Sequence, residues 1–395
     1  FKLLKTNLEN MITNKFLTLI FTIFISLLVN IPIAQAVLTT KAKQAVLYDA
    51  NSNMILYAKN HQELMPPSSM SKLMTLYILF EQIDQGNIKL DDEFLVSEKA
   101  WRKKGSKMFV GYNSKVKVED LIRGIVVQSG NDACIVVAEA ISGSEDSFVK
   151  LMNNKAKFLQ LKDSNFTNST GWPDPEHRMT AMDIMYLSKR LIEDFPDLYH
   201  YFNEMEFTYN DIRQFNRNIL LNDNIGVDGL KTGFTQEAGY GISVSATRNQ
   251  RRLLVVVNGL KSKSERIQEA AKLLEYGYRN FELVKLFDEG EKIDKAEVWF
   301  GVEDYIPLVT NQEVILSLPR NWQDNIKVNL IYNSPVPAPI TKGQELAKIK
   351  ITSDKINDSS DNIVEIPLYA GKDMSKLPLH LHIIESIKYY IFKNK

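Results

Sequence analysis

The sequence predicts an α+β protein, with a larger domain that mixes helices and strands and a smaller domain built of strands alone. Its 395 residues exceed what one average domain needs, so two domains and short terminal segments are expected. Helical and strand-like patterns alternate in the first part, whereas only short strand patterns follow later. We therefore predict a mixed domain over residues 37–284 and a β-rich domain over residues 290–376.

The first 36 residues predict a signal peptide. Lys15 precedes an apolar run that ends at Val29, and a small-residue A-x-A pattern ends at Ala36. This order is typical of a leader that is removed on export. An uncleaved membrane anchor is the alternative, although the run is shorter than the about 20 apolar residues that a span needs. Met11 leaves open that residues 1–10 are an upstream mis-start.

The composition argues against several classes of protein. The 48 basic and 48 acidic side chains balance, so no overall positive field would hold nucleic acid, and no such partner is expected. Cys134 is the only cysteine, and its apolar surroundings predict a buried, unreactive thiol. The five histidines form no H-E-x-x-H pattern, and no G-x-S-x-G elbow, Walker A loop or dinucleotide fingerprint occurs. We expect neither a metal nor a cofactor.

The mixed domain opens with a predicted β-hairpin and a long helix. Residues 44–48 and 54–59 are typical of two short strands around turn residues. After two prolines, apolar residues at helical spacing predict a helix from Met70, which Ser68 or Ser69 could cap.

Further elements complete both domains. Helical patterns in the mixed domain follow at residues 118–127, after a break at 129–131, and at 147–161, 180–192 and 264–278. An alternating strand is expected at 239–247, and the apolar run in 252–260 predicts a central buried strand. After a charged stretch at 288–295, the β-rich domain shows strand patterns at 297–300, 313–318, 327–332, 346–352 and 363–368.

The last residues predict an amphipathic helix over 377–395. Its apolar side chains fall on one side, and its polar positions are mostly cationic. Such a helix is expected to lie on an anionic lipid surface. Packing against the β-rich domain is the alternative.

Three short motifs carry the candidate chemistry. Ser69 and Lys72 form an S-x-x-K pattern, Ser129 and Asn131 form S-x-N, and Lys231 begins K-T-G. S-x-x-K alone is weak, since it recurs at 114–117 and 147–150, where we interpret it as a surface coincidence. Order and context strengthen the set: the first motif begins a helix, the second interrupts two helices, and the third leads into a strand.

The residue types suit nucleophilic catalysis. A serine hydroxyl needs a base within about 3 Å, and a lysine serves only when it is neutral. Burial and a second cation lower a lysine pKa, so Lys72 beside an apolar face and opposite Lys231 meets both conditions. Ser129 could relay a proton to the leaving group, and Asn131 could orient Lys72 and hold a substrate amide. The helix start at Ser69 offers backbone N–H groups to an oxyanion.

Phe234 and Gly233 are also expected to contribute to catalysis by Ser69. The backbone N–H of Phe234, just past the K-T-G motif, could be the second oxyanion donor. Gly233 lacks the Cβ that would block a substrate lying along the strand.

The chain resembles the low-molecular-mass penicillin-binding proteins of the serine D-alanyl-D-alanine carboxypeptidase family, peptidase family S11. The three motifs match those of penicillin-binding proteins and class A β-lactamases. The resemblance also rests on Asn216-Arg217-Asn218, on Val227 to Gly233, and on Val298-Trp299-Phe300-Gly301 and Lys342-Gly343-Gln344 in the second domain. It implies the penicillin-recognising fold, an antiparallel sheet covered by helices beside an all-helical part.

The resemblance also implies an activity. Ser69 would attack the carbonyl between the two terminal D-alanines of a peptidoglycan stem pentapeptide, and water would hydrolyse the acyl-enzyme. Thr232 and Arg266 would bind the terminal carboxylate, and Arg217 would organise the Ser129–Lys231 side of the cleft. An exposed helix charge is the alternative for Arg266. β-Lactams would acylate the same serine and leave slowly.

Some questions stay open at this point. Some family members have histidine after K-T-G where this chain has Phe234, so any role of that side chain is absent. Glu176 could act as a deacylating glutamate, but an exposed turn is the simpler interpretation. A β-lactamase or D,D-endopeptidase with the same motifs, or a catalytically silent penicillin-binding scaffold, remains an alternative. The expected location is the periplasmic face of a bacterial inner membrane.

Overall fold

The computed structural model describes residues 38–320, 322–324, 326–353 and 363–381. The predicted signal peptide and residues 382–395 of the predicted terminal helix lie outside this range, so both stay predictions. Among the described residues, no helix is long and apolar enough to cross a membrane.

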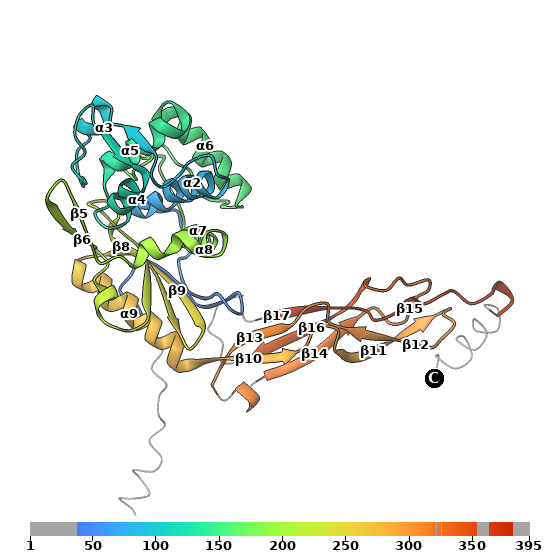
Figure 1. Cartoon of the computed structure of the whole chain (residues 1–395). Coiled ribbons are helices and arrows are strands. Elements are labelled where there is room, and N and C mark those ends of the chain that lie inside the picture. Colours follow the sequence, from blue (N-terminus) through green and yellow to red (C-terminus); the bar gives the residue numbers. More distant parts are fainter. Residues whose placement is uncertain (1–37, 321, 325, 354–362, 382–395) are drawn as a thin grey trace, which may run out of the picture. The chain divides into compact units, whose positions relative to one another are not determined.

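A five-stranded antiparallel sheet forms the centre of the mixed part (Figure 1). Its strands, in spatial order, are β2 (Met54–Lys59), β1 (Gln44–Asp49), β9 (Arg251–Leu260), β8 (Gly239–Arg248) and β7 (Val227–Thr235). The predicted hairpin is confirmed by the pairing of β1 with β2. The run Leu253–Val257 is buried in β9, which occupies the middle position as predicted.

Helices pack around this sheet and form a second, helical region (Figure 1). The long ones are α2 (Lys72–Asp84), α4 (Val118–Val126), α5 (Asn131–Ser142), α6 (Glu145–Phe158), α7 (Ala181–Asp194) and α9 (Lys263–Asn280). The short ones are α3 (Glu98–Arg102), α8 (Pro196–Tyr199) and the 3₁₀ turns η1 (Ser68–Ser71), η2 (His200–Asn203) and η3 (Ile219–Asn222). Ser144, Thr180 and Ser262 cap α6, α7 and α9 by accepting backbone N–H bonds.

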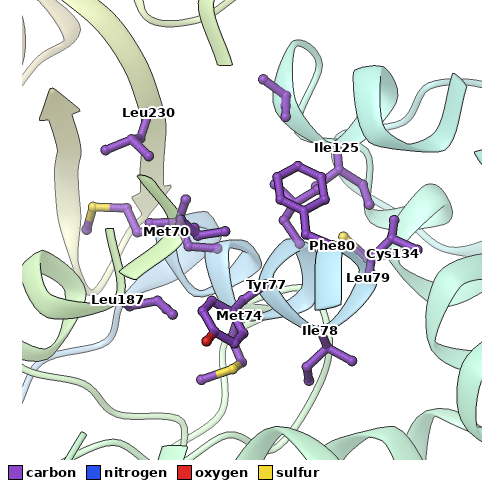
Figure 2. Close-up of a cluster of buried hydrophobic side chains, with 14 of the residues drawn as sticks. Met70, Met74, Tyr77, Ile78, Leu79, Phe80, Ile125, Cys134, Leu187 and Leu230 are labelled. Carbon is purple, nitrogen blue, oxygen red and sulfur yellow. The ribbon is translucent and has the colours of Figure 1, made fainter. Parts of the chain in front are cut away.

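Helix α2 is buried almost all round, which explains why its sequence is apolar on more than one face. Figure 2 shows Leu79 and Phe80 of α2 on the side of Ile125 and Cys134, and Leu187 on the opposite side of the helix. Each fully buried side chain of this size contributes about 1.5–3 kcal/mol. The helix that follows the candidate nucleophile is therefore anchored in the core.

The sequence did not predict two small hairpins of the mixed part. They are formed by β3 (Glu93–Leu95) with β4 (Lys115–Lys117), and by β5 (Glu206–Tyr209) with β6 (Ile212–Phe215). Both contain charged and exposed residues, which hide the alternation of a strand.

From residue 281 to residue 378 the described elements are strands and one 3₁₀ turn, η4 (Trp322–Asp324), and residues 379–381 are helical. One sheet joins β14 (Ile326–Tyr332), β16 (Glu345–Ser353), β17 (Ile363–Ala370), β12 (Tyr305–Val309), β11 (Lys292–Trp299) and β15 (Val336–Pro337). A second pairs β10 (Phe281–Phe287) with β13 (Val314–Pro319). The α+β class is confirmed, whereas β10, β12, β15 and the charged start of β11 were not predicted.

Candidate active site

The predicted nucleophile and base lie together at the start of α2. Ser69 belongs to the turn η1, and Lys72 is the first residue of α2. The Lys72 Nζ is 2.8 Å from the Ser69 Oγ and also donates to the Thr170 carbonyl oxygen, at 2.5 Å. The prediction that Ser68 or Ser69 caps this helix is wrong. Ser71 occupies the N-cap position of α2, and no side chain there accepts a backbone N–H. The Ser69 hydroxyl contacts Lys72 instead.

Lys72 sits in an environment that favours its neutral form. Its side chain is completely buried, and burial is the main reason why its pKa falls from 10.5 to about 8. The charge of Arg217 lowers the pKa further, while Asp132 acts in the opposite direction. By contrast, the lysines of the two other S-x-x-K patterns, Lys117 and Lys150, are exposed. Burial therefore distinguishes the candidate motif from its repeats.

The S-x-N motif forms the connection between α4 and α5, as predicted. Ser129 has a left-handed φ of 64° and is fully buried, and its Oγ has no hydrogen-bond partner among the described residues. Asn131 begins α5, but its side-chain amide donates to the Lys104 carbonyl at 2.9 Å. This bond uses one of the two amide hydrogens and leaves the Asn131 Oδ1 aside, so the role of Asn131 in orienting Lys72 stays a prediction.

Strand β7 brings the third motif to the same place. Lys231 is 1% exposed, and its pKa lies well below 10.5 because of burial first and the charges of Lys72 and Arg217 next. A Cβ on Gly233 would lie 3.0 Å from the Ser68 Cβ and 3.1 Å from the Pro67 oxygen. Gly233 thus lets β7 pack against the nucleophile turn, and it also lines the cavity beside Ser69, so its role in making room for substrate stays a prediction.

Two arginines define a cationic cavity of about 950 Å³ next to Ser69. Arg217 Nη1 donates to the Ser106 Oγ at 2.8 Å, and Arg266 Nη2 donates to the Arg217 carbonyl at 3.3 Å. Arg266 is 5% exposed, so it is not the exposed helix charge that was the alternative. Burial, followed by the charge of Arg217, lowers its pKa to about 10. Thr232 lines the same cavity, which therefore suits a carboxylate.

A second cavity of about 470 Å³ also borders Ser69. Asn131, Trp172 and Glu237 are among its lining residues. Phe234 lines both cavities, and its half-exposed ring lies 4.2 Å from that of Tyr240. The proposed oxyanion role of its backbone N–H stays a prediction.

The comparisons with known proteins agree with this geometry. The sequence profile of the D-alanyl-D-alanine carboxypeptidase family matches residues 31–262, and that of the penicillin-binding protein 5 C-terminal domain matches residues 281–376. The chain belongs to the D-alanyl-D-alanine carboxypeptidase family. Among the curated members, D-alanyl-D-alanine carboxypeptidase DacD of Escherichia coli is 38% identical over 82% of this chain and 85% of that protein.

Solved structures place the fold in the same carboxypeptidase family. Penicillin-binding protein 5 from Haemophilus influenzae has a TM-score of 0.76 and 35% identity, covering 86% of this chain and 99% of that one. Penicillin-binding protein D2 from Listeria monocytogenes, solved with ampicillin bound, has a TM-score of 0.57 and 28% identity, covering 62% of this chain and 100% of that one. The penicillin-recognising fold predicted from the motifs is thereby confirmed.

Sequence reasoning missed the structural role of Asp132 in this site. The buried Asp132 carboxylate accepts the backbone N–H groups of Met108, Phe109 and Val110, and so holds the loop that carries Ser106. Its place directly after S-x-N was the only available signal.

Glu176 is exposed, in agreement with the turn interpretation. Among the described residues, no group of three or more His, Cys, Asp and Glu could hold a metal ion.

Proposed function

We propose that this chain is a serine-type D-alanyl-D-alanine carboxypeptidase that removes the terminal D-alanine from peptidoglycan stem pentapeptides. The observation that carries the proposal is the 2.8 Å contact between Ser69 Oγ and a fully buried Lys72, beside a cationic cavity. The family membership of the chain supports the same conclusion.

In the proposed mechanism, neutral Lys72 accepts the proton of Ser69 as Oγ attacks the carbonyl between the two D-alanines. Backbone N–H groups of Ser69 and Phe234 stabilise the oxyanion. The C–N bond then breaks, and the proton taken up by Lys72 passes through the Ser129 hydroxyl to the nitrogen of the departing D-alanine. Water then attacks the resulting ester as Lys72 accepts its proton, the bond between the acyl carbon and Ser69 Oγ breaks, Lys72 returns the proton to Oγ, and the shortened peptide leaves. The Ser129 hydroxyl has no hydrogen-bond partner in the part of the chain that the structure describes, which supports such a relay.

We propose that Thr232 and Arg266 bind the terminal carboxylate of the substrate, with Lys231 adding charge. The proposal rests on their place in the cationic cavity and on the Arg266 Nε, which is buried and has no partner among the described residues. A buried donor without a partner costs free energy until a ligand satisfies it. Arg217, which bonds to Ser106, is proposed to hold the walls of this cavity rather than to touch the reacting atoms.

Arg266→Gln is expected to lower kcat/KM by about 10- to 100-fold for a peptide that ends in a free carboxylate. A hydrogen bond to a charged group contributes about 1.5–3 kcal/mol, which corresponds to that factor. A C-terminal carboxamide peptide should be a poor substrate for both proteins and should lose little in the variant. Lys261→Gln, which removes an exposed charge near the start of the same helix, is the control. Equal losses on acid and amide peptides would contradict the carboxylate role.

We also propose that β-lactams acylate Ser69. The ampicillin-bound relative supports this proposal. The deciding experiment measures D-alanine release from a stem pentapeptide, labelling by fluorescent penicillin, and the site of the adduct by mass spectrometry. Slow loss of the label together with D-alanine release is expected. Rapid penicillin hydrolysis without D-alanine release would indicate a β-lactamase, and neither labelling nor release would indicate a silent scaffold.

We propose that the chain is exported, with the leader removed after Ala36, and that residues 377–395 bind the outer face of the inner membrane. The division into domains over residues 37–284 and 290–376 is part of this proposal, and the two family profiles support it.

Deleting residues 377–395 is expected to abolish sedimentation of the mature chain with vesicles of anionic phospholipid, because the cationic amphipathic segment is lost. Activity on a soluble pentapeptide should stay within about twofold. A truncated chain that still sedimented with the vesicles would contradict the membrane role of this segment.

A further inference from the structure

Glu145 is a buried carboxylate that the proposed mechanism does not use. It is the first residue of α6, directly after the capping Ser144, and it is only 7% exposed. Burial raises its pKa, but the hydrogen bonds from Lys99 and Ser169 outweigh burial and hold the pKa below its ordinary value. The side chain is therefore charged at neutral pH, and a buried charge of this kind depends on its partners.

The two oxygens of the Glu145 carboxylate have different partners. Oε2 lies 2.8 Å from the ammonium of Lys99, an exposed side chain of α3. Oε1 accepts both the backbone N–H and the hydroxyl of Ser169, at 3.1 and 2.9 Å. Because Ser169 is fully buried, these two bonds are shielded from water, where hydrogen bonds to a charged group are strong.

Ser169 directly precedes the residue that contacts the proposed base. The carbonyl of the next residue, Thr170, accepts the hydrogen bond from Lys72. The Ser169 carbonyl itself accepts a bond from Thr75 Oγ1 of α2 at 2.7 Å. The backbone N–H, the hydroxyl and the carbonyl of Ser169 are thus all bonded, which fixes the conformation of the chain just before Thr170.

The place of the Lys72 amine depends on this loop. The amine contacts two oxygens, the Ser69 hydroxyl and the Thr170 carbonyl. If the loop shifted, the amine would either follow the carbonyl away from the hydroxyl or lose its second partner. A displacement of about 1 Å in an active site can lower a rate 10²-fold. Glu145 does not touch the reacting atoms, but a single residue, Ser169, connects it to the carbonyl that holds the base.

We propose that Glu145 is a positioning residue for acylation, because its Oε1 holds Ser169 and hence the loop whose carbonyl contacts Lys72. The contact of Oε2 with Lys99 joins α3 to α6 and is not needed for the reaction. A role confined to that ion pair would be purely structural, and the different partners of the two oxygens allow the roles to be separated. The inference rests on the proposed function of Lys72 as the base.

The test compares Glu145→Ala, Glu145→Gln and Lys99→Ala. Glutamine keeps a carbonyl oxygen that can accept both bonds from Ser169, but it cannot form the ion pair. Stopped-flow acylation by a chromogenic β-lactam is measured at about pH 9, above the Lys72 pKa of about 8, so that most of the amine is neutral. The limiting rate should fall about 10- to 100-fold in Glu145→Ala, because the loop is released.

Glu145→Gln and Lys99→Ala are the matched controls, since each removes the ion pair and keeps the acceptor for Ser169. Their limiting rates should stay within about threefold of the wild type, because a partly exposed ion pair contributes little. The dissociation constant of the β-lactam before acylation should be unchanged in all three variants, since Glu145 does not contact the ligand. A purely structural role predicts instead that the three variants lose rate together.

Ser169→Ala is a milder variant that removes only the hydroxyl bond to Oε1, and it should lower the limiting rate about threefold to tenfold. It decides the question if Glu145→Ala does not fold. Equal losses in Glu145→Gln and Glu145→Ala, or a wild-type limiting rate in Ser169→Ala, would overturn the inference. A wild-type chain that the β-lactam does not acylate would overturn the proposed function instead.

Discussion

Replacing Ser69 by alanine is expected to abolish both covalent labelling by penicillin and release of D-alanine. The Ser69 hydroxyl lies 2.8 Å from Lys72 Nζ and is the proposed nucleophile, so no acyl-enzyme should form without it. Loss of a nucleophile of this kind reduces kcat by about 10⁴-fold or more. Intact-protein mass spectrometry after penicillin treatment should detect no adduct, and D-alanine should stay at the background level.

Ser147→Ala is the matched control, because Ser147 belongs to an S-x-x-K pattern whose lysine is exposed. Its labelling and activity should equal those of the wild type, and its thermal midpoint should match that of Ser69→Ala. An adduct that persists in Ser69→Ala, mapped to any other residue, would refute the assignment of the nucleophile.

Lys72→Arg is expected to lower the rate of acylation by about 10²–10⁴-fold, the usual contribution of a general base. Arginine keeps the positive charge but cannot lose its proton at any pH in the working range. Stopped-flow acylation with a chromogenic β-lactam measures the effect. Lys150→Arg, at the surface pattern, serves as the control and should not change the rate. A Lys72→Arg variant that retained the wild-type rate would exclude the lysine as the base.

The pH dependence follows from the same group. The pKa of Lys72 is about 8 because burial disfavours its charged form, and the reactive species is the neutral amine. The acylation rate of the wild type should therefore rise about tenfold per pH unit below pH 8 and level off above it. An unperturbed lysine would place this bend near 10.5. A bend near that value, or a rate that falls between pH 6 and 8, would contradict the proposed role.

Helices and buried strands could be predicted well from the sequence, because their patterns report burial directly. The apolar residues of α2 and the run Leu253–Val257 of β9 gave unambiguous signals, and both elements are found where expected. Most strands that were missed have mixed exposure; the exception is β7 (Val227–Thr235), which is largely buried but whose apolar residues are interrupted by charged residues and glycines. In β11, for example, the first residues Lys292–Lys295 are mostly exposed, so their charges resemble those of a linker. Partial burial leaves too weak a periodicity to be recognised.

The candidate site could be predicted as a set of residues but not as a set of contacts. Ser69 and Lys72 are three residues apart, in the turn η1 and at the start of the helix α2 that continues it, so their proximity follows from local geometry. The partner of Asn131 is a carbonyl 27 residues away, and the second partner of Lys72 is 98 residues away. Backbone acceptors of this kind have no residue-type signature, so no motif could reveal them.

The carbonyl of Thr170 has a consequence for the direction in which the amine can react. A neutral amine has two hydrogens and one lone pair, and the bond to Thr170 uses one hydrogen in a fixed direction. Rotation about the last carbon–nitrogen bond is thereby limited, which favours aiming the lone pair at the Ser69 hydroxyl. The loop is itself tied to α2, because Thr75 Oγ1 donates to the Ser169 carbonyl at 2.7 Å. The orientation of the Lys72 amine is thus governed by the main-chain carbonyl of Thr170, which no side-chain substitution can remove.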